Sequence, residues 1–331
     1  MKFRVFIVFV LFIGIVLPGI SHAQNKVVVI PLMSDCPPPV LPPCANTYTN
    51  SIGMTFNLLP AGTFTMGSPA TEPGGPYINE TEHQVTLSKA FYMQTTEVTN
   101  GHWDAVIVDK GRGVNPSTSH TGDLYPVESI NWYEAASFAN WISYDEGRTP
   151  CYSGEGTCTG TLGDDFTCTT AVYVAGCDGY RLPTEAQWEY AARATTTTAW
   201  SYFYSYDTSA DPGQVTDTGF NSNLDAMGWY YFNRTTQYPD GTKPVARKQG
   251  NKWGLFDMHG NVWEWCQDWY DDYPSGPVTD PQGPVTGSLR VIRGGSWNGS
   301  ARVARSANRG NGAPGFRDFN LGFRLALPPG Q

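Results

Sequence analysis

Oxygen ligands for a metal ion are concentrated in the turn between Asp257 and Glu264. These two carboxylates bracket Gly260, so a tight turn would bring them together with the backbone carbonyls between them. Carboxylate and carbonyl oxygens are the hard ligands that Ca²⁺ prefers, and the spacing therefore predicts a calcium site. The same stretch also suits a buried turn held by hydrogen bonds and by the rings of Trp263 and Trp265, and the sequence leaves both interpretations open.

The seven cysteines offer disulfide bonds or soft metal ligands. Cys36 and Cys44 flank a proline-rich turn and are placed to pair with each other. Four more lie between Cys151 and Cys177, where two internal disulfides would hold an insertion with little core of its own. The sequence does not fix the pairing. Cys266 is left over, and because aromatic residues surround it we expect a buried free thiol.

The histidines and serines form no recognisable catalytic group. Beyond residue 23 the histidines are His83, His102, His120 and His259, and they lack the short spacing of a zinc or facial-triad iron site. The Asp-Met-His-Gly-Asn turn around His259 suits a structural hydrogen bond. Ser296 follows two glycines and could be exposed, but no motif marks a base that would activate it.

Residues 1–23 have the order of a secretory signal peptide. Lys2 and Arg4 precede an apolar stretch from Val5 to Leu17, and a small-residue site ends at Ala23. We expect cleavage after Ala23, with an uncleaved anchor as the alternative. The mature protein is then secreted or periplasmic and does not insert into a membrane.

Residues 24–50 are rich in proline and predict an extended linker before a domain that starts near Ser51. The domain is rich in glycine and aromatic residues, and only 15% of the chain is charged, which is typical of a loop-rich protein held by aromatic packing. The net charge of −9 argues against nucleic acid or an anionic membrane as a partner.

Periodic patterns predict the elements that position these residues. Alternation of apolar and polar residues predicts strands over 54–66 and 83–93. Helical spacing predicts helices over 96–109 and 129–143, the second with a buried face of Trp132, Ala135, Ala136, Ala139 and Ile142. Thr184 and Gln187 form a capping-box pair that starts a third helix. We expect mostly irregular chain from Ala194 to Pro284.

Three blocks of sequence carry a family resemblance. They are residues 180–193 (YRLPTEAQWEYAAR), residues 254–265 (GLFDMHGNVWEW) and the pair Arg293-Gly294-Gly295-Ser296-Trp297 and Asn320-Leu321-Gly322-Phe323-Arg324. In this order they resemble the formylglycine-generating enzyme, or sulfatase-modifying factor, family over residues 51–327. The resemblance implies an α+β fold of the C-type-lectin-like kind, as a single compact domain with much irregular structure. It also implies that the C-terminal segment returns to the core and carries the functional surface.

The founding enzymes of this family oxidise a sulfatase cysteine with copper held by two thiolates, which are soft ligands suited to Cu(I). Counted from Ser296, the matching positions are Gly299 and Ala304, neither of which can bind a metal. We therefore expect no copper and no formylglycine-generating activity. Other members use iron, and a relative in thiol-histidine biosynthesis takes histidine ligands from a helical domain that this sequence lacks.

The family's calcium loop, matched residue by residue, gives Asp257 and Glu264 as side-chain ligands and Gly260 and Val262 as backbone ligands. The departure is Asp257, where the family often has asparagine. A second family calcium site would lie near residues 223–225, but its pattern here is too blurred to assign.

Small and polar residues fill the C-terminal stretch between the fixed motifs, and this is not the composition of a core segment. We expect arginines (Arg302, Arg305, Arg309 and Arg317) to hold these loops by bidentate hydrogen bonds while other residues face solvent. The expected ligand contacts are Asn298, Gly299, Ser300, Val303, Asn311, Phe316, Asp318, Phe319 and Asn320. The layout resembles the variable regions of lectin-fold proteins that retroelements diversify, and a static surface is an equal alternative.

The sequence thus favours an exported, non-catalytic binding module that uses calcium and binds a protein or a glycan. One alternative is an enzyme of the formylglycine-generating family that acts on an exported protein or peptide. A structural component of the cell envelope is the other.

Overall fold

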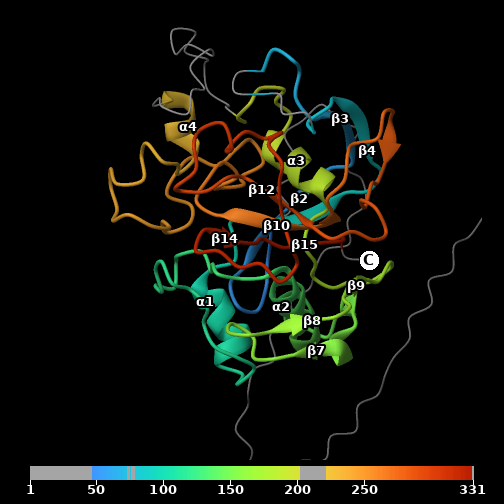
Figure 1. Cartoon of the computed structure of the whole chain (residues 1–331), viewed down its shortest axis with the longest axis vertical. Coiled ribbons are helices and arrows are strands. Elements are labelled where there is room, and N and C mark those ends of the chain that lie inside the picture. The colour runs from blue at the N-terminus through green and yellow to red at the C-terminus, as the bar shows by residue number, and fades with distance from the viewer. Residues whose placement is uncertain (1–46, 73–74, 76–78, 202–220, 330–331) are drawn as a thin grey trace, which may run out of the picture. The chain divides into compact units, whose positions relative to one another are not determined.

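A computed structural model describes residues 47–72, 75, 79–201 and 221–329 (Figure 1). Its first sheet joins the two ends of the described chain in the order β1 (Thr47–Thr49), β2 (Thr55–Leu59), β5 (Phe91–Gln94) and β15 (Ala326–Leu327). All its pairs are antiparallel, with Ala326 opposite Met93. The C-terminal segment therefore returns to the core. Because β1 begins at Thr47, it lies inside the stretch that we assigned to the linker, and the end of that linker is corrected to residue 46 or earlier.

A second sheet contains parts of the sequence blocks that carry the family resemblance, in the order β13 (Gly310–Gly312), β12 (Arg290–Arg293), β10 (Trp263–Trp269) and β14 (Leu321–Gly322). Only the β10–β14 pair is parallel. Strand β10 falls in the stretch that we expected to be mostly irregular. Five of its seven residues are buried, so it lacks the alternation that reveals a half-exposed strand.

The third sheet has the order β11 (Val278–Thr279), β4 (His83–Leu87) and β3 (Gly62–Met66). Each of the two strand regions predicted from alternation is divided in the structure. Pro60 separates β2 from β3, and Ser88 to Ala90 separate β4 from β5, so the halves enter different sheets. Proline cannot donate to a strand ladder, which explains the first break.

The helices are α1 (Asn100–Trp103), a π-helical turn (Asp104–Val108), α2 (Trp132–Asp145), α3 (Glu185–Arg193) and α4 (Ser222–Met227). The predicted capping box of Thr184 and Gln187 is confirmed. Both other predicted starts were a few residues early. The N-caps are Thr99 and Asn131, because Val98 N instead donates to Phe323 O and Ser129 has a positive φ of 61°. All five residues of the predicted buried face of α2 are buried.

The cysteine-rich insertion consists of β6 (Tyr152–Ser153), a 3₁₀ turn (Glu155–Thr157), β7 (Cys158–Thr159), β8 (Thr167–Cys168) and β9 (Val172–Tyr173). Its two internal disulfides are confirmed and join Cys151 to Cys177 and Cys158 to Cys168. Cys266 is buried and free, as expected. Cys36 and Cys44 lie outside the described residues. Persistent disulfides fit an oxidising compartment such as the cell exterior.

None of the helices in the described part of the chain has the length and apolar character needed to cross a membrane.

Candidate functional site

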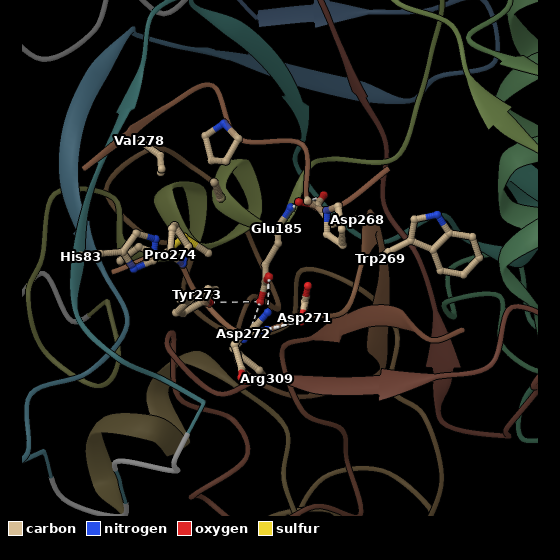
Figure 2. A pocket seen from close by; sticks show the side chains of 15 residues that line it. His83, Glu185, Asp268, Trp269, Asp271, Asp272, Tyr273, Pro274, Val278 and Arg309 are labelled. Atoms are coloured by element: carbon tan, nitrogen blue, oxygen red, sulfur yellow. Dashed lines mark hydrogen bonds and ion pairs between the residues drawn. The ribbon is translucent and has the colours of Figure 1, made fainter. Parts of the chain in front are cut away.

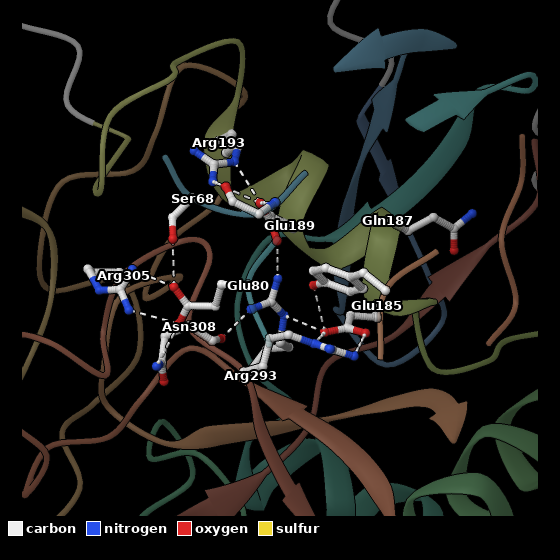
Figure 3. A network of polar contacts seen from close by, with 12 residues as sticks. Ser68, Glu80, Glu185, Gln187, Glu189, Arg193, Arg293, Arg305 and Asn308 are labelled. Carbon is white, nitrogen blue, oxygen red and sulfur yellow. Dashed lines mark hydrogen bonds and ion pairs between the residues drawn. The ribbon is translucent and has the colours of Figure 1, made fainter. Parts of the chain in front are cut away.

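Buried arginines anchor the C-terminal segment (Figure 3). Arg305 makes a bidentate contact with Glu80, at 2.8 and 2.9 Å, and also donates to Glu72 at 2.7 Å. Arg309 makes a second bidentate contact, with Glu185, at 2.6 and 2.8 Å. The expected arginine clamps are thus confirmed for these two residues.

The carboxylates of this network come from α3 and from the chain after β3. Glu185 and Glu189 of α3 face β12, where Arg293 contacts Glu189 and the backbone oxygen of Asn308. Burial alone would raise the pKa of Glu185, but the charges of Arg309 and Arg293 hold it below its ordinary value. These charges are buried but compensated, which is the condition under which buried ion pairs are tolerated.

Outward-facing residues occupy the same segment. None of the nine expected contact residues is buried, and Phe316 and Phe319 expose 46% and 45% of their surface. Phe319 packs against Trp297, with ring centroids 5.9 Å apart. Beside it, Asn298 Oδ1 accepts hydrogen bonds from Ser296 Oγ at 2.8 Å and from Asn320 Nδ2 at 2.9 Å. Asn298, Phe319 and Asn320 therefore form one group.

The nine residues do not form one contiguous set of contacts. Asn311 lies in β13, at one edge of the second sheet, whereas Asn320 immediately precedes β14 at the other edge. Neighbouring strands are about 4.8 Å apart, so the two edges of four strands are separated by roughly 14 Å. The order of residues along the segment does not reveal this separation.

Tyr231 was not singled out from the sequence, although it adjoins the predicted surface. Its backbone N–H donates to Gly299 O at 2.9 Å, its side chain is 47% exposed, and the Arg234 guanidinium lies 3.7 Å above its ring. The only signal in the sequence is the aromatic run from Trp229 to Phe232. An exposed aromatic ring stacked on a cation is a rigid contact element for a ligand.

The turn from Asp257 to Glu264 is formed, and both carboxylate oxygens of Glu264 accept hydrogen bonds from other side chains. Its Oε1 accepts from Arg324 Nη2, and its Oε2 accepts from Arg324 Nε and Trp188 Nε1, all at 2.7 Å. Asp257 has a positive φ of 56°, and its Oδ2 accepts from Ala246 N at 2.7 Å. A Cβ at Gly260 would lie 1.9 Å from Trp229 O, so only glycine fits there. The backbone of Val262 continues into β10.

Glu97 was not among the residues predicted at this turn from the sequence. It is fully buried, and neither of its carboxylate oxygens has a hydrogen-bond partner within the described residues; the same is true of Asp257 Oδ1. Burial, followed by the charge of Asp257, raises the pKa of Glu97 well above its ordinary value. Burial also raises the pKa of Asp257 to about 6. Orphaned carboxylate oxygens at one buried position fit a hard cation.

The described residues contain no group of three or more His, Cys, Asp or Glu side chains already arranged to hold a metal ion. The carboxylate oxygens without hydrogen-bond partners at this turn belong to Glu97 and Asp257, whereas both oxygens of Glu264 are engaged.

Comparison with known proteins places this geometry in a family. A family model described as "Sulfatase-modifying factor enzyme 1-like domain" matches residues 47–328. The chain belongs to this family. The formylglycine-generating enzyme of Streptomyces coelicolor is 30% identical over 289 residues, covering 81% of this chain and 87% of that enzyme. The chaperone protein LppX of Paenibacillus barcinonensis is 32% identical over 228 residues, covering 67% of this chain and 74% of that protein.

Solved structures agree with the expected fold of the sulfatase-modifying factor family. Treponema denticola variable protein 1 has a TM-score of 0.67 and 33% identity, covering 87% of this chain and all of that one. PvdO from Pseudomonas aeruginosa has a TM-score of 0.65 and 25% identity, covering 86% of this chain and 98% of that one. The expected α+β domain of the formylglycine-generating-enzyme kind is confirmed.

The family's two copper-cysteine positions hold no sulfur in this member. Gly299 is half-buried and Ala304 fully buried. His259 contacts one of these positions, because its Nδ1 is hydrogen-bonded to Ala304 O at 2.9 Å. Its Nε2 is hydrogen-bonded to Ser201 Oγ at 2.9 Å, so the expected structural hydrogen bonding of this histidine is confirmed. Burial lowers the pKa of His259 to about 4, which keeps the ring neutral at physiological pH. Ser296 Oγ donates to Asn298, which is not a base.

Proposed function

We propose that this protein is an exported, non-catalytic binding module in which the C-terminal surface of a sulfatase-modifying factor scaffold contacts a protein or glycan ligand. One observation carries the proposal. The segment from Asn298 to Asn320 holds its backbone through buried arginine clamps, while none of the nine expected contact side chains is buried. Such a segment can change its outward side chains without losing its position.

Likeness to a protein named a variable protein supports this choice. This chain covers all of Treponema denticola variable protein 1 at 33% identity. Diversification of the outward residues by a retroelement is the finer form of the proposal, and a static surface of the same shape serves the same binding role. The group of Asn298, Phe319 and Asn320, together with Tyr231, is the centre of the proposed surface.

Calcium is the cofactor that we propose for the scaffold. Glu97 and Asp257 would supply carboxylate oxygens to it, and the calcium would contact buried oxygens that otherwise have no hydrogen-bond partner within the described residues, namely both of Glu97 and Oδ1 of Asp257. This arrangement would support the turn before β10, where Asn261 O accepts a hydrogen bond from Trp297 N at 2.8 Å and so holds the loop of Trp297.

Ligand screening with matched variants tests the binding proposal. The full mature chain is applied to a glycan array and to a panel of purified extracellular proteins, and any ligand found is remeasured with Phe319→Ser and Asn298→Lys. We expect both variants to weaken binding at least tenfold. The control is Val285→Ser, because Val285 is 95% exposed and lies outside the surface. Equal binding by all four proteins would place the ligand elsewhere.

The enzymatic alternative has its own readout. The purified protein is assayed for copper and iron per chain and for conversion of a cysteine peptide to formylglycine. We expect neither a stoichiometric transition metal nor turnover, since positions 299 and 304 offer no ligand atom. Stoichiometric copper or iron would contradict the non-catalytic proposal.

A further inference from the structure

A second feature is a pocket that lies between the start of α3, the end of β10 and the chain around β11 (Figure 2). Part of its lining is apolar and comes from Met66, Pro274, Val278 and Pro281. Four acids also line it, namely Glu185, Asp268, Asp271 and Asp272. The pocket is separate from the group of Asn298, Phe319 and Asn320, none of which lines it.

The cationic side chain that lines the pocket, Arg309, already has partners within the protein. Arg309 gives two hydrogen bonds to Glu185 and a third, of 3.0 Å, to Asn79 O, and it stacks 3.8 Å above the ring of Tyr273. The Tyr273 hydroxyl donates to the same Glu185 carboxylate at 3.1 Å. His83 Nδ1 is bonded to Thr81 O at 3.1 Å. An anionic ligand would therefore find no free cation here.

A buried carboxylate oxygen, in contrast, has no hydrogen-bond donor in the part of the chain that the structure describes. Asp268 is only 4% exposed and lines the pocket. Its Oδ2 accepts from the backbone N–H of Glu185 at 2.9 Å, and no donor among the described residues meets its Oδ1. Burial, followed by the neighbouring charge of Glu185, raises the pKa of Asp268 to about 7. Asp271 and Asp272 add exposed negative charge at the same pocket.

We propose that this pocket binds an alkylammonium group, with Asp268 Oδ1 as its ion-pair partner and Pro274, Val278 and Pro281 beside its methylene chain. The group is carried either by a lysine side chain of another polypeptide or by a free small amine. This proposal is independent of the binding surface at residues 298–320.

The geometry favours an ammonium over other groups. A guanidinium binds a carboxylate through two parallel hydrogen bonds, and Asp268 has only one free oxygen because Oδ2 is held by Glu185 N. An ammonium is a compact point charge that needs only one close oxygen. A neutral alkyl group would fill the apolar side but leave the buried carboxylate without a partner, which costs free energy.

n-Butylammonium chloride is the probe for the test, with n-butanol and sodium butyrate as neutral and anionic controls at equal ionic strength and pH 8. Binding is followed by amide NMR of the full mature chain. We expect saturable shifts at Trp269, Tyr273 and Val278 with butylammonium alone. Comparable shifts at these residues with butanol would overturn the proposal without any mutation being needed.

Asp268→Asn keeps the side-chain shape and the acceptor for Glu185 N, while it removes the charge. We expect butylammonium binding to weaken at least tenfold, and to stay within twofold in Asp109→Asn, which changes an exposed acid elsewhere. A folded Asp268→Asn protein that binds within twofold of wild type would refute the ion pair.

Two further ligands separate the possible sources. Acetyl-Gly-Lys-Gly-amide binding at least as tightly as butylammonium assigns the group to a polypeptide, whereas binding of 1,4-diaminobutane with exclusion of the peptide assigns it to a free amine. The arginine peptide acetyl-Gly-Arg-Gly-amide should bind more weakly than its lysine counterpart. Equal affinity for the two peptides would overturn the ammonium assignment.

Discussion

Two sets of residues alternate along the C-terminal segment. One set is buried and ion-paired, and the other is exposed to solvent. Arg305 and Arg309 are buried and paired with carboxylates from α3 and from the chain after β3. Phe316 and Phe319, only a few residues further on, expose nearly half of their surface. We call the first set, with Arg293, the frame, and the second set, with the other seven expected contact residues, the outer set.

This difference separates the position of the backbone from the identity of the side chains. Removing one member of a buried ion pair leaves a charge without a partner, so the frame should tolerate little change. Surface substitutions usually alter stability by less than about 0.5 kcal/mol, so the outer set should tolerate much.

Loss of a frame arginine is expected to have the largest effect. Arg305→Met would leave Glu80 without its bidentate partner and Glu72 without its donor, and should lower the free energy of unfolding by about 3–5 kcal/mol. Chemical denaturation measures the change. Arg247→Met, at an exposed arginine, is the control and should change stability by less than about 0.5 kcal/mol. A small loss for Arg305→Met would mean that the frame does not hold the segment.

A pH-sensitive contact links the C-terminal segment to α2. Arg317 lies 2.8 Å from Glu134, whose pKa is raised by burial from 4.5 to about 7. Between these values the folded protein keeps a proton that the unfolded chain releases. The stabilisation from this group is therefore full below about pH 4.5 and is lost as the pH rises through 7.

Glu134→Gln should remove this dependence. Relative to the variant, wild type should lose up to about 3 kcal/mol of unfolding free energy from pH 4.5 to pH 8, measured by denaturation at several pH values. Glu82→Gln, at an exposed acid, should follow wild type. Parallel curves for wild type and Glu134→Gln would show that the contact is not pH-sensitive.

Calcium should stabilise the turn from Asp257 to Glu264. At a concentration of 100 times its Kd, calcium should add about 2.7 kcal/mol to the unfolding free energy, seen as a higher Tm than in EDTA. Glu97→Gln should abolish that shift and, in EDTA, be at least as stable as wild type because a buried carboxylate without partners is gone. Glu82→Gln should retain the shift. A calcium response that survives Glu97→Gln would remove this residue from the site.

Local signals in the sequence were enough for some of these features. The capping box of Thr184 and Gln187 fixed the start of α3, and the sequence blocks were enough to infer the family and the fold. The arginine clamps followed from arginines interspersed among small polar residues. Local patterns gave the wrong helix start where a distant segment binds the backbone. Val98 N donates a hydrogen bond to Phe323 O, so Val98 lies outside the helix predicted to include it.

The parts of the site that were missed depend on contacts between distant residues. Glu97 and Asp257 are 160 positions apart in sequence, and no local pattern marks Glu97 as a cation ligand. The partners of Glu264, Arg324 and Trp188, come from two other sequence blocks, so its contacts could not be predicted locally. The separation of Asn311 from Asn320 follows from the strand order of the second sheet, which the sequence of the segment does not contain.

The smallest effect is expected in the outer set itself. Phe316→Ser changes a side chain that is 46% exposed and has no buried polar partner, so the unfolding free energy should fall by less than about 1 kcal/mol. Denaturation alongside Arg305→Met makes the comparison direct, because the two positions are 11 residues apart in one segment. A loss as large as that of Arg305→Met would show that the outer residues also hold the fold. The segment could then not vary its surface freely, and the proposed binding role would lose its structural basis.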